Sequence, residues 1–470
     1  MQTKRLLDFV RKPHVLFVVF AILFGAIFIK ITPPLWGLDE PSHVARVFHI
    51  VRGELVSSKQ ESDPANTMPD NFFELTQYRV KDILDVVKND NILFRKDVTD
   101  PKAYDKITSE HFDKSEHFFP YVSNYSPVSY PGPIVGLEVS KLFNLDIGNT
   151  LTLMRCMSLI SYVTLAAASI WLVKKFKIKW IFFVVALIPT AIFQASVVTA
   201  DTMVLGLALL FFALLFRICL EEKIDRKLLV ALAVVSVLIP LTKLNHVILI
   251  LPLLFLPSTK FRSSKRALMY KILVVALGLV LALVWAHISN VTATPDISQR
   301  ADQLAISPGG QIKYALGSPL SFGIAIIKSL VIFGDAYYQG IFFTVSGNSV
   351  ATPLLMTIVL SFVIWLVAVQ SRTELDKIKR MIVWCGLASI ALVITIFGAL
   401  YAGFTPVGWP FVDGVQGRYF LPLVIPIISL MAILMPIKIT IKPKHRDIIL
   451  VATSFMALAI SALYVFVAYY

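Results

Sequence analysis

The stretch VLFVVFAILFGAIFIKITPPLWGLDEPSHVARVFHI, residues 15–50, joins an apolar segment of membrane length to two adjacent carboxylates. A bilayer core of roughly 30 Å takes about 20 apolar residues as a helix, so the first part predicts a membrane helix over residues 15–32. Lys30 and TPPLW follow it instead of a small-residue cleavage site, which favours a retained helix over a signal peptide. Asp39 and Glu40 then stand side by side where the chain leaves the membrane.

The composition predicts an all-α polytopic membrane protein. Of the 470 residues, 57% are hydrophobic and only 16% are charged, with a mean hydropathy of +0.74. Soluble proteins are about a quarter charged. The net charge of +14 comes largely from short clusters between apolar segments, such as KKFKIK, STKFRSSKR and KITIKPKHR. Short basic loops stay in the cytoplasm, so the positive charge indicates topology and not binding to nucleic acid.

Apolar segments of this kind predict about 11 transmembrane helices in the plasma membrane. The expected divisions are a cytoplasmic N-terminus and first helix (1–32), a large first extracytoplasmic loop (33–150), helices that include a short hairpin (151–289), a second extracytoplasmic loop (290–350) and C-terminal helices (351–470). Residues 33–149 contain 18 acidic and 12 basic residues and many aromatics. This loop is too polar to be embedded, and we expect a small, partly helical subdomain resting on the membrane.

Two apolar regions do not fit simple crossings. Residues 228–257 begin and end in the cytoplasm, and each arm of about 12 to 14 residues is short for a full crossing. A short hairpin would place Lys243, in PLTKLN, at its tip towards the outer leaflet. Residues 319–347 are apolar but must start and finish outside, so we expect an interfacial or re-entrant segment. Residues 180–198 are expected to form one continuous helix.

The residues after the paired carboxylates predict an amphipathic helix on the outer membrane surface. Pro41 suits the first turn of a helix, and Val44, Val47 and Phe48 recur at helical spacing with His43 and Arg46 among them. The simpler interpretation is that the two carboxylates cap this helix, since its dipole favours anions at the N-terminus. Capping does not exclude catalysis: repulsion between adjacent carboxylates and burial both favour a better general base at neutral pH. Which of the two is the base stays open.

Three more charged residues are expected on the same outer face. Asp201 lies in a tight turn between two membrane helices, where capping is the simpler role. Lys243 is costly at membrane depth and is either functional or extended towards lipid headgroups. Arg418, in GVQGRYFLP, lies at the outer end of a helix, where the positive-inside rule does not favour a cation, and a guanidinium suits bidentate binding of phosphate.

The aromatics near this face have two interpretations, and a metal has little support. Tyr130, in NYSPVSYPG, belongs to an interfacial aromatic belt or contacts a sugar ring, and Tyr419 is expected to contact sugar or acceptor. No set of His, Cys, Asp and Glu has zinc-like spacing. We therefore expect no required cofactor, with a divalent metal as the less favoured alternative.

The chain resembles the GT-C superfamily of polytopic glycosyltransferases, and within it a bacterial membrane-protein family catalogued as a domain of unknown function. The resemblance rests on five stretches in order between residues 33 and 426: PPLWGLDEPSHVARVFHIVRGEL, SYPG, TADTMVLGLALL, LTKLNHVILILP and VQGRYFLPLVIP. The first and last of these are the specific ones. The resemblance implies inverting transfer of a sugar from a polyprenyl-phosphate donor to a glycan acceptor of the cell envelope, on the extracytoplasmic side.

The resemblance also implies roles for four of the candidate residues, while Asp201 is only a candidate counterpart of the second acidic residue of that superfamily. Asp39 maps to the general base, with Glu40 as neighbour or substitute, and Arg418 and Lys243 map to donor-phosphate binding. Contacts to sugar or acceptor are expected from His43, Arg46, Asp201, Tyr130 and Tyr419. The other expected partner is membrane lipid, and the alternatives are a lipid-linked glycan polymerase or ligase, or a transporter or flippase that is not an enzyme.

Overall fold

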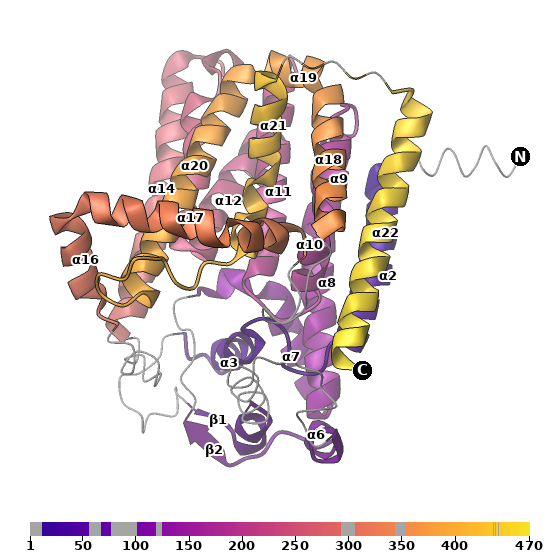
Figure 1. The fold of residues 1–470 in the computed structure, drawn as a ribbon, viewed down its shortest axis with the longest axis vertical. Coiled ribbons are helices and arrows are strands. Elements are labelled where there is room, and N and C mark those ends of the chain that lie inside the picture. The colour runs from indigo at the N-terminus through magenta and orange to yellow at the C-terminus, as the bar shows by residue number, and fades with distance from the viewer. Residues whose placement is uncertain are drawn as a thin grey trace, which may run out of the picture.

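The computed structural model describes residues 12–55, 67–76, 101–118, 125–292, 306–343, 354–435 and 441–470, with Ile437 and Ile439. Helices dominate these ranges, and one small antiparallel sheet pairs β1 (Thr67–Pro69) with β2 (Glu116–Phe118), Met68 opposite His117. Much of the first outer loop (residues 56–66, 77–100 and 119–124) and part of the second (293–305 and 344–353) lie outside the described residues. Figure 1 shows a bundle of long helices with the sheet and several short helices gathered at one end.

The first half of the chain contributes α2 (Pro13–Ile31), α3 (Glu40–Val51), α6 (Pro101–Thr108), η2 (Pro127–Ser129), α7 (Pro131–Leu142), α8 (Ile147–Leu172), α9 (Lys179–Ala186), α10 (Pro189–Ala195), α11 (Asp201–Leu220) and α12 (Arg226–Thr242). The second half contributes η3 (Leu244–His246), α13 (Val247–Ile250), η4 (Leu251–Phe255), η5 (Ser258–Lys260), α14 (Ser264–Thr292), α16 (Pro308–Gly317), α17 (Pro319–Phe342), α18 (Leu354–Gln370), α19 (Arg372–Lys377), α20 (Lys379–Phe404), η7 (Gly417–Leu423), α21 (Val424–Leu434) and α22 (Pro443–Tyr469).

Eight helical segments of the described ranges are long and apolar enough to cross a membrane. They are α2, α8, α11, α14, α17, α20, the continuous η7–α21 segment and α22. The shorter helices α9, α12 and α18 run alongside them in the bundle (Figure 1). A multi-pass membrane protein is thereby confirmed, while the number of about 11 crossings stays a prediction.

Helix α17 differs from the other long apolar helices in its direction. It lies across the bundle and does not follow the direction of α20 and α21 (Figure 1). Only 11% of its most apolar window is buried, and Leu320 and Val331 are both 78% exposed. The interfacial placement expected for residues 319–347, of which the last four lie outside the described residues, stays a prediction.

Two helical predictions need correction. The helix expected over residues 180–198 is broken into α9 and α10, because Pro189 has no N–H to continue the ladder and begins a new helix. The hairpin at residues 228–257 does turn at Lys243, but its arms are unequal. The first arm is the 17-residue α12, whereas the second is the irregular series η3, α13 and η4, which contains Pro252.

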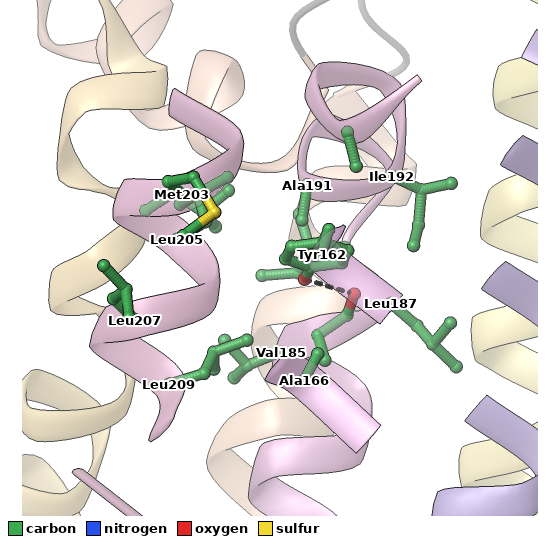
Figure 2. Packing of buried hydrophobic residues seen from close by; sticks show 14 of the residues in the cluster. Tyr162, Ala166, Val185, Leu187, Ala191, Ile192, Met203, Leu205, Leu207 and Leu209 are labelled. Atoms are coloured by element: carbon green, nitrogen blue, oxygen red, sulfur yellow. Dashed lines mark hydrogen bonds between the residues drawn. The ribbon is translucent and has the colours of Figure 1, made fainter. Parts of the chain in front are cut away.

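The best-packed part of the bundle surrounds α11, of which 78% of the most apolar window is buried. Tyr162 of α8 reaches across to α9, where its hydroxyl donates to the Ala186 carbonyl at 2.8 Å (Figure 2). This bond satisfies a carbonyl that the Pro189 break leaves without a partner in its own helix. The broken α9–α10 segment is therefore held firmly, and it leads directly into the turn before Asp201.

Helix α3 does not lie on the membrane surface as predicted. Both of its faces are buried: Val44 and Val47 on the apolar side, and Arg46 and His49 on the polar side, each 0% exposed. The segment between α2 and α8, which we call the outer subdomain, covers the polar face. Arg46 donates to the carbonyls of Tyr125 (3.0 Å) and Leu55 (2.7 Å), so its guanidinium is hydrogen-bonded to the backbone of the loop.

The basic loops meet at the other end of the bundle. The amides of Lys177 and Ile178 donate to Glu374 of α19 at 2.7 and 3.1 Å, and Arg372 donates to the Met435 carbonyl at 2.6 Å. Clustered basic loops at one end are the arrangement that the positive-inside rule gives to a cytoplasmic face. The side of the membrane that each end faces stays a prediction.

Candidate functional site

The adjacent carboxylates Asp39 and Glu40 point into different surroundings. Asp39 has a left-handed backbone (φ 55°) just before α3, a conformation that Asp adopts more readily than most residues but still at a cost. Its side chain is 57% exposed, while that of Glu40 is 0% exposed. The turn therefore presents one carboxylate to the outside and buries the other.

Both carboxylate oxygens of Glu40 accept hydrogen bonds from other groups of the protein. Arg155 of α8 donates to both of its carboxylate oxygens, at 2.7 and 2.6 Å, and also to the carbonyls of Thr32 and Pro33. The amides of Gly37 and Val198 donate to Glu40 at 2.9 and 3.0 Å. Burial alone raises the pKa of this carboxyl, but Arg155 and the two amides hold it below the ordinary value.

This bidentate pair joins three parts of the chain. It ties the end of α2, the start of α3 and the turn that contains Val198 to one buried guanidinium. Asp39 lies between the end of α2 and the start of α3, and Asp201 comes directly after the turn that contains Val198. The Glu40–Arg155 pair thus fixes the two acidic residues of the site relative to each other.

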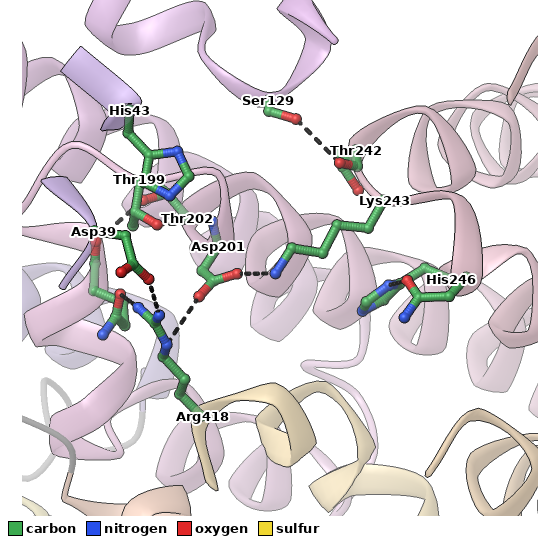
Figure 3. A network of polar contacts seen from close by, with 12 residues as sticks. Asp39, His43, Ser129, Thr199, Asp201, Thr202, Thr242, Lys243, His246 and Arg418 are labelled. Atoms are coloured by element: carbon green, nitrogen blue, oxygen red, sulfur yellow. Dashed lines mark hydrogen bonds and ion pairs between the residues drawn. The ribbon is translucent and has the colours of Figure 1, made fainter. Parts of the chain in front are cut away.

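Four charged residues far apart in sequence meet at the junction between the outer subdomain and the bundle (Figure 3). We call Asp39, Asp201, Lys243 and Arg418 the four-charge cluster. Arg418 forms an ion pair with Asp39 through one terminal nitrogen, and its Nε lies 3.7 Å from Asp201. Lys243 Nζ lies 2.5 Å from the other oxygen of Asp201. The two carboxylates and two cations sum to zero charge.

Each member of the cluster stands at the end of an element. Asp39 precedes α3, Asp201 begins α11, Lys243 ends α12 and Arg418 is the second residue of η7. Arg418 is only 3% exposed and Asp201 11%, so Asp39 is the member that opens towards the outside. Gln194 adds a buried amide, whose oxygen lies 3.5 Å from Arg418.

Aromatic rings enclose the cationic side of the cluster. The Lys243 ammonium lies 5.1 Å from the ring centre of Tyr419 and 5.7 Å from that of Tyr125, and the Arg418 guanidinium lies 5.3 Å from Tyr419. Such cation–π contacts stabilise partly desolvated cations by about 0.5–2 kcal/mol each. Tyr419 therefore lies at the site as predicted, although its proposed contact with sugar is untested.

His43 and Tyr130 form a buried pair beside the cluster. His43 Nδ1 lies 2.7 Å from the Tyr130 hydroxyl, and both residues are nearly inaccessible. Burial lowers the pKa of His43 to about 4, although Asp39 and Asp201 oppose the shift. His43 is therefore neutral at physiological pH, and Tyr130 is a core residue and not part of an exposed belt.

The turn that carries Arg418 is seated against the transverse helix α17. A Cβ added to Gly417 would lie 2.2 Å from the Tyr337 carbonyl oxygen and 2.6 Å from the Gly340 carbonyl carbon, so only glycine allows this approach. The position of α17 thereby sets the position of Arg418.

Sequence reasoning predicted all four members of the cluster but missed its supports. Arg155, Gln194 and Tyr125 were not singled out, although Arg155 is a charge within an apolar span, which is itself a functional signal. Of the other predicted residues, His43 and Tyr419 adjoin the cluster, whereas Arg46 binds loop carbonyls away from it. No group of three His, Cys, Asp or Glu residues in the described ranges is arranged to hold a metal ion.

These features define a polytopic helical membrane protein with a charged site at one end of its bundle. The chain matches the family described as "Predicted membrane protein (DUF2142)" over residues 22–428 and belongs to it. That range includes all four members of the cluster. No curated protein matches the chain.

Proposed function

We propose that the protein is an inverting glycosyltransferase that moves a sugar from a polyprenyl-phosphate donor to an extracytoplasmic acceptor of the cell envelope, such as a wall polysaccharide or teichoic acid. The observation that carries this proposal is the exposed carboxylate of Asp39, paired with a buried arginine at the end of a membrane bundle. A lipid-linked donor holds its phosphate and anomeric carbon at the membrane boundary. A base and a phosphate-binding cation at that boundary are what the reaction requires.

Asp39 is the general base in this proposal, and Glu40 positions it. The acceptor hydroxyl attacks the anomeric carbon, the bond from that carbon to the phosphate oxygen breaks, and its electron pair leaves with the phosphate. The hydroxyl proton passes to Asp39. Glu40 takes no part in this transfer because its two oxygens already accept four hydrogen bonds.

Arg418 changes its partner during the reaction. With the site empty of donor it neutralises Asp39, and an ion-paired carboxylate accepts a proton less readily. The donor phosphate draws the guanidinium away and leaves Asp39 as the stronger base. When Asp39 takes the proton it loses its charge, while the departing phosphate gains one, so Arg418 and Lys243 stabilise the leaving group.

The experiment is a transfer assay with full-length protein purified in detergent. Synthetic polyprenyl-phosphate sugars serve as donors and native envelope polymer as acceptor, and we expect transfer that free polyprenyl phosphate inhibits competitively. Arg418→Lys keeps the charge but loses the planar fork, and we expect donor KM to rise about tenfold. Arg372→Lys, at the opposite end of the bundle, is the matched control.

Two outcomes contradict the proposal. Absence of sugar transfer by the wild type from every donor would favour a transporter or a scaffold. Transfer with equal donor KM in Arg418→Lys and Arg372→Lys would remove Arg418 from phosphate binding. An enzyme that joins intact lipid-linked glycans and ignores single-sugar donors would instead be a polymerase or ligase.

A further inference from the structure

An apolar groove runs along the outer edge of the bundle, at the end opposite the four-charge cluster. It has a volume of about 330 Å³ and is lined by one residue of α2 and five of α22: Phe20, Ile448, Val451, Ala452, Phe455 and Met456. This volume is at the lower end of the range for ligand pockets. The groove lies between α2 and α22, and Figure 1 shows α22 at the margin of the bundle with α2 behind it. In a membrane protein such a margin faces lipid.

The shape of the groove fits a single hydrocarbon chain. From Ile448 to Met456 the lining extends over nine residues of one helix, or about 12 Å. Phe455 forms part of its wall and packs edge-on against Phe20 and Phe24, with ring centres 5.6 and 5.2 Å apart. Ile448, Phe455 and Met456 remain 47%, 42% and 60% exposed, so these side chains do not fill the space themselves.

Basic residues stand at one end of this groove. Lys444 is four residues before Ile448 and seven before Val451, which places it on the same face of α22, one turn beyond the groove. Lys442 directly precedes the first residue of α22, and His445 is next to Lys444 in the sequence; all three are exposed. Arg446 is engaged by Asp447 at 2.6 Å, whereas Lys442 and Lys444 form no ion pair with any described residue.

We propose that this groove binds one acyl chain of an anionic phospholipid, whose phosphate lies on Lys442 and Lys444. The charge is complementary to an anionic headgroup and stands at one end only, as an amphiphile requires. A polybasic segment next to a membrane helix attracts anionic lipid. A second copy of the chain across this face would bring the same lysines together, and their repulsion disfavours it.

The bound lipid would contact both α2 and α22 and so stabilise their packing against each other. Helix α2 leads to the turn that carries Asp39, and Trp36 in that turn packs edge-on against Tyr469 of α22 at 5.6 Å. Filling the groove therefore stabilises the helix pair that supports the outer site, and it does so whatever reaction that site performs.

The test compares phosphatidylglycerol with phosphatidylcholine of identical acyl chains, added to the full-length protein in detergent and followed by native mass spectrometry. We expect phosphatidylglycerol to bind at least fivefold more tightly than phosphatidylcholine. The double variant Lys442→Gln/Lys444→Gln should lose this preference. The matched control Lys265→Gln/Arg266→Gln removes two exposed charges from the start of α14 and should retain it.

A second variant tests the groove itself. Ala452→Trp fills the space and should reduce binding of both lipids severalfold without changing the monodisperse elution of the protein. Equal affinities for the two lipids, or equal losses in the control and the lysine variants, would overturn the proposal. Dissociation of a dimer by Ala452→Trp would also overturn it, because the groove would then be covered by a second copy.

Discussion

At the scale of single residues, the site depends on one backbone conformation. A left-handed Asp39 between buried Leu38 and buried Glu40 turns two neighbouring carboxylates in different directions. One of them faces the outside and pairs with Arg418, and the other anchors the turn through Arg155. Neighbouring side chains of the same chemistry thus have separate tasks, which are set by burial.

The first prediction concerns the anchoring pair. Glu40→Gln leaves Arg155 buried without its counter-charge, which costs about 3–5 kcal/mol, so we expect a clear fall in thermal midpoint and in sugar transfer. The double variant Glu40→Gln/Arg155→Gln removes both charges and should recover part of the stability but little activity. Unchanged stability in Glu40→Gln, measured by thermal unfolding in detergent, would contradict the anchoring role.

The second prediction concerns pH. Burial lowers the pKa of both His43 and His49 to about 4, whereas an unfolded His titrates near 6.5. Between these values the unfolded chain binds more protons than the folded one, so stability falls as the pH drops from 6.5 towards 4. Each His contributes at most about 1.4 kcal/mol per pH unit.

The thermal midpoint in detergent, followed from pH 7.5 to 4.5, checks this expectation. His43→Gln should flatten the decline, and His43→Gln/His49→Gln should flatten it further. His111→Gln changes an exposed histidine of the same outer loop and should leave the slope as in the wild type. If the thermal midpoint fell equally steeply with pH in all variants, groups other than His43 and His49 would be the cause.

At the scale of elements, the site is assembled from helix ends. Asp39 directly precedes α3 and Lys243 directly follows α12, while Asp201 and Arg418 lie in the first turns of α11 and η7. The end of α12 determines where Lys243 lies, and the close packing of Gly417 in η7 against α17 determines where Arg418 lies. The elements therefore act as supports, and the charged residues of the site stand at their ends.

The third prediction tests the seat of η7. Gly417→Ala places a methyl group within 2.2–2.6 Å of the α17 backbone, so η7 or α17 must shift. We expect a rise of tenfold or more in donor KM, with the protein still folded. Gly317→Ala, where nothing lies within 4 Å, is the control. Equal kinetics of the two variants would show that the position of Arg418 does not depend on this contact.

At the scale of the whole molecule, the bundle has two different ends and one helix that does not follow its axis. Helices α9 and α19, whose ends carry basic loops, lie at one end, and the sheet with α3, α6 and α7 lies at the other (Figure 1). Helix α17 meets the length and hydropathy of a crossing helix yet lies across the bundle. Composition alone does not distinguish these two placements, because an interfacial helix exposes the same apolar surface to lipid.

The fourth prediction follows from the orientation of α17. In a background lacking the three native cysteines, Gly317→Cys and Asp335→Cys should both react from the same side with a membrane-impermeant thiol reagent. Lys223→Cys, between α11 and α12, should react only after permeabilisation. Labelling of position 317, just before α17, and position 335, within it, from opposite sides would mean that the helix crosses the membrane.

Sequence reasoning reached the class of fold and the members of the cluster, because hydropathy, loop charge and misplaced charges are local signals. The break at Pro189 was available from the sequence and was overlooked. The burial of α3 was not available, since its amphipathic pattern suits a membrane surface and a covered core equally well. The choice between Asp39 and Glu40 depends on one φ angle and on Arg155, which is more than 100 residues away.

The most direct test of the central claim is sugar transfer by Asp39→Asn compared with Asp105→Asn. Both variants make the same change in the first outer loop, but Asp105 lies on α6 away from the cluster. We predict that Asp39→Asn loses about 10²–10⁴-fold in kcat while retaining donor binding, and that Asp105→Asn transfers sugar like the wild type. Wild-type kcat in Asp39→Asn would contradict the assignment of Asp39 as the general base.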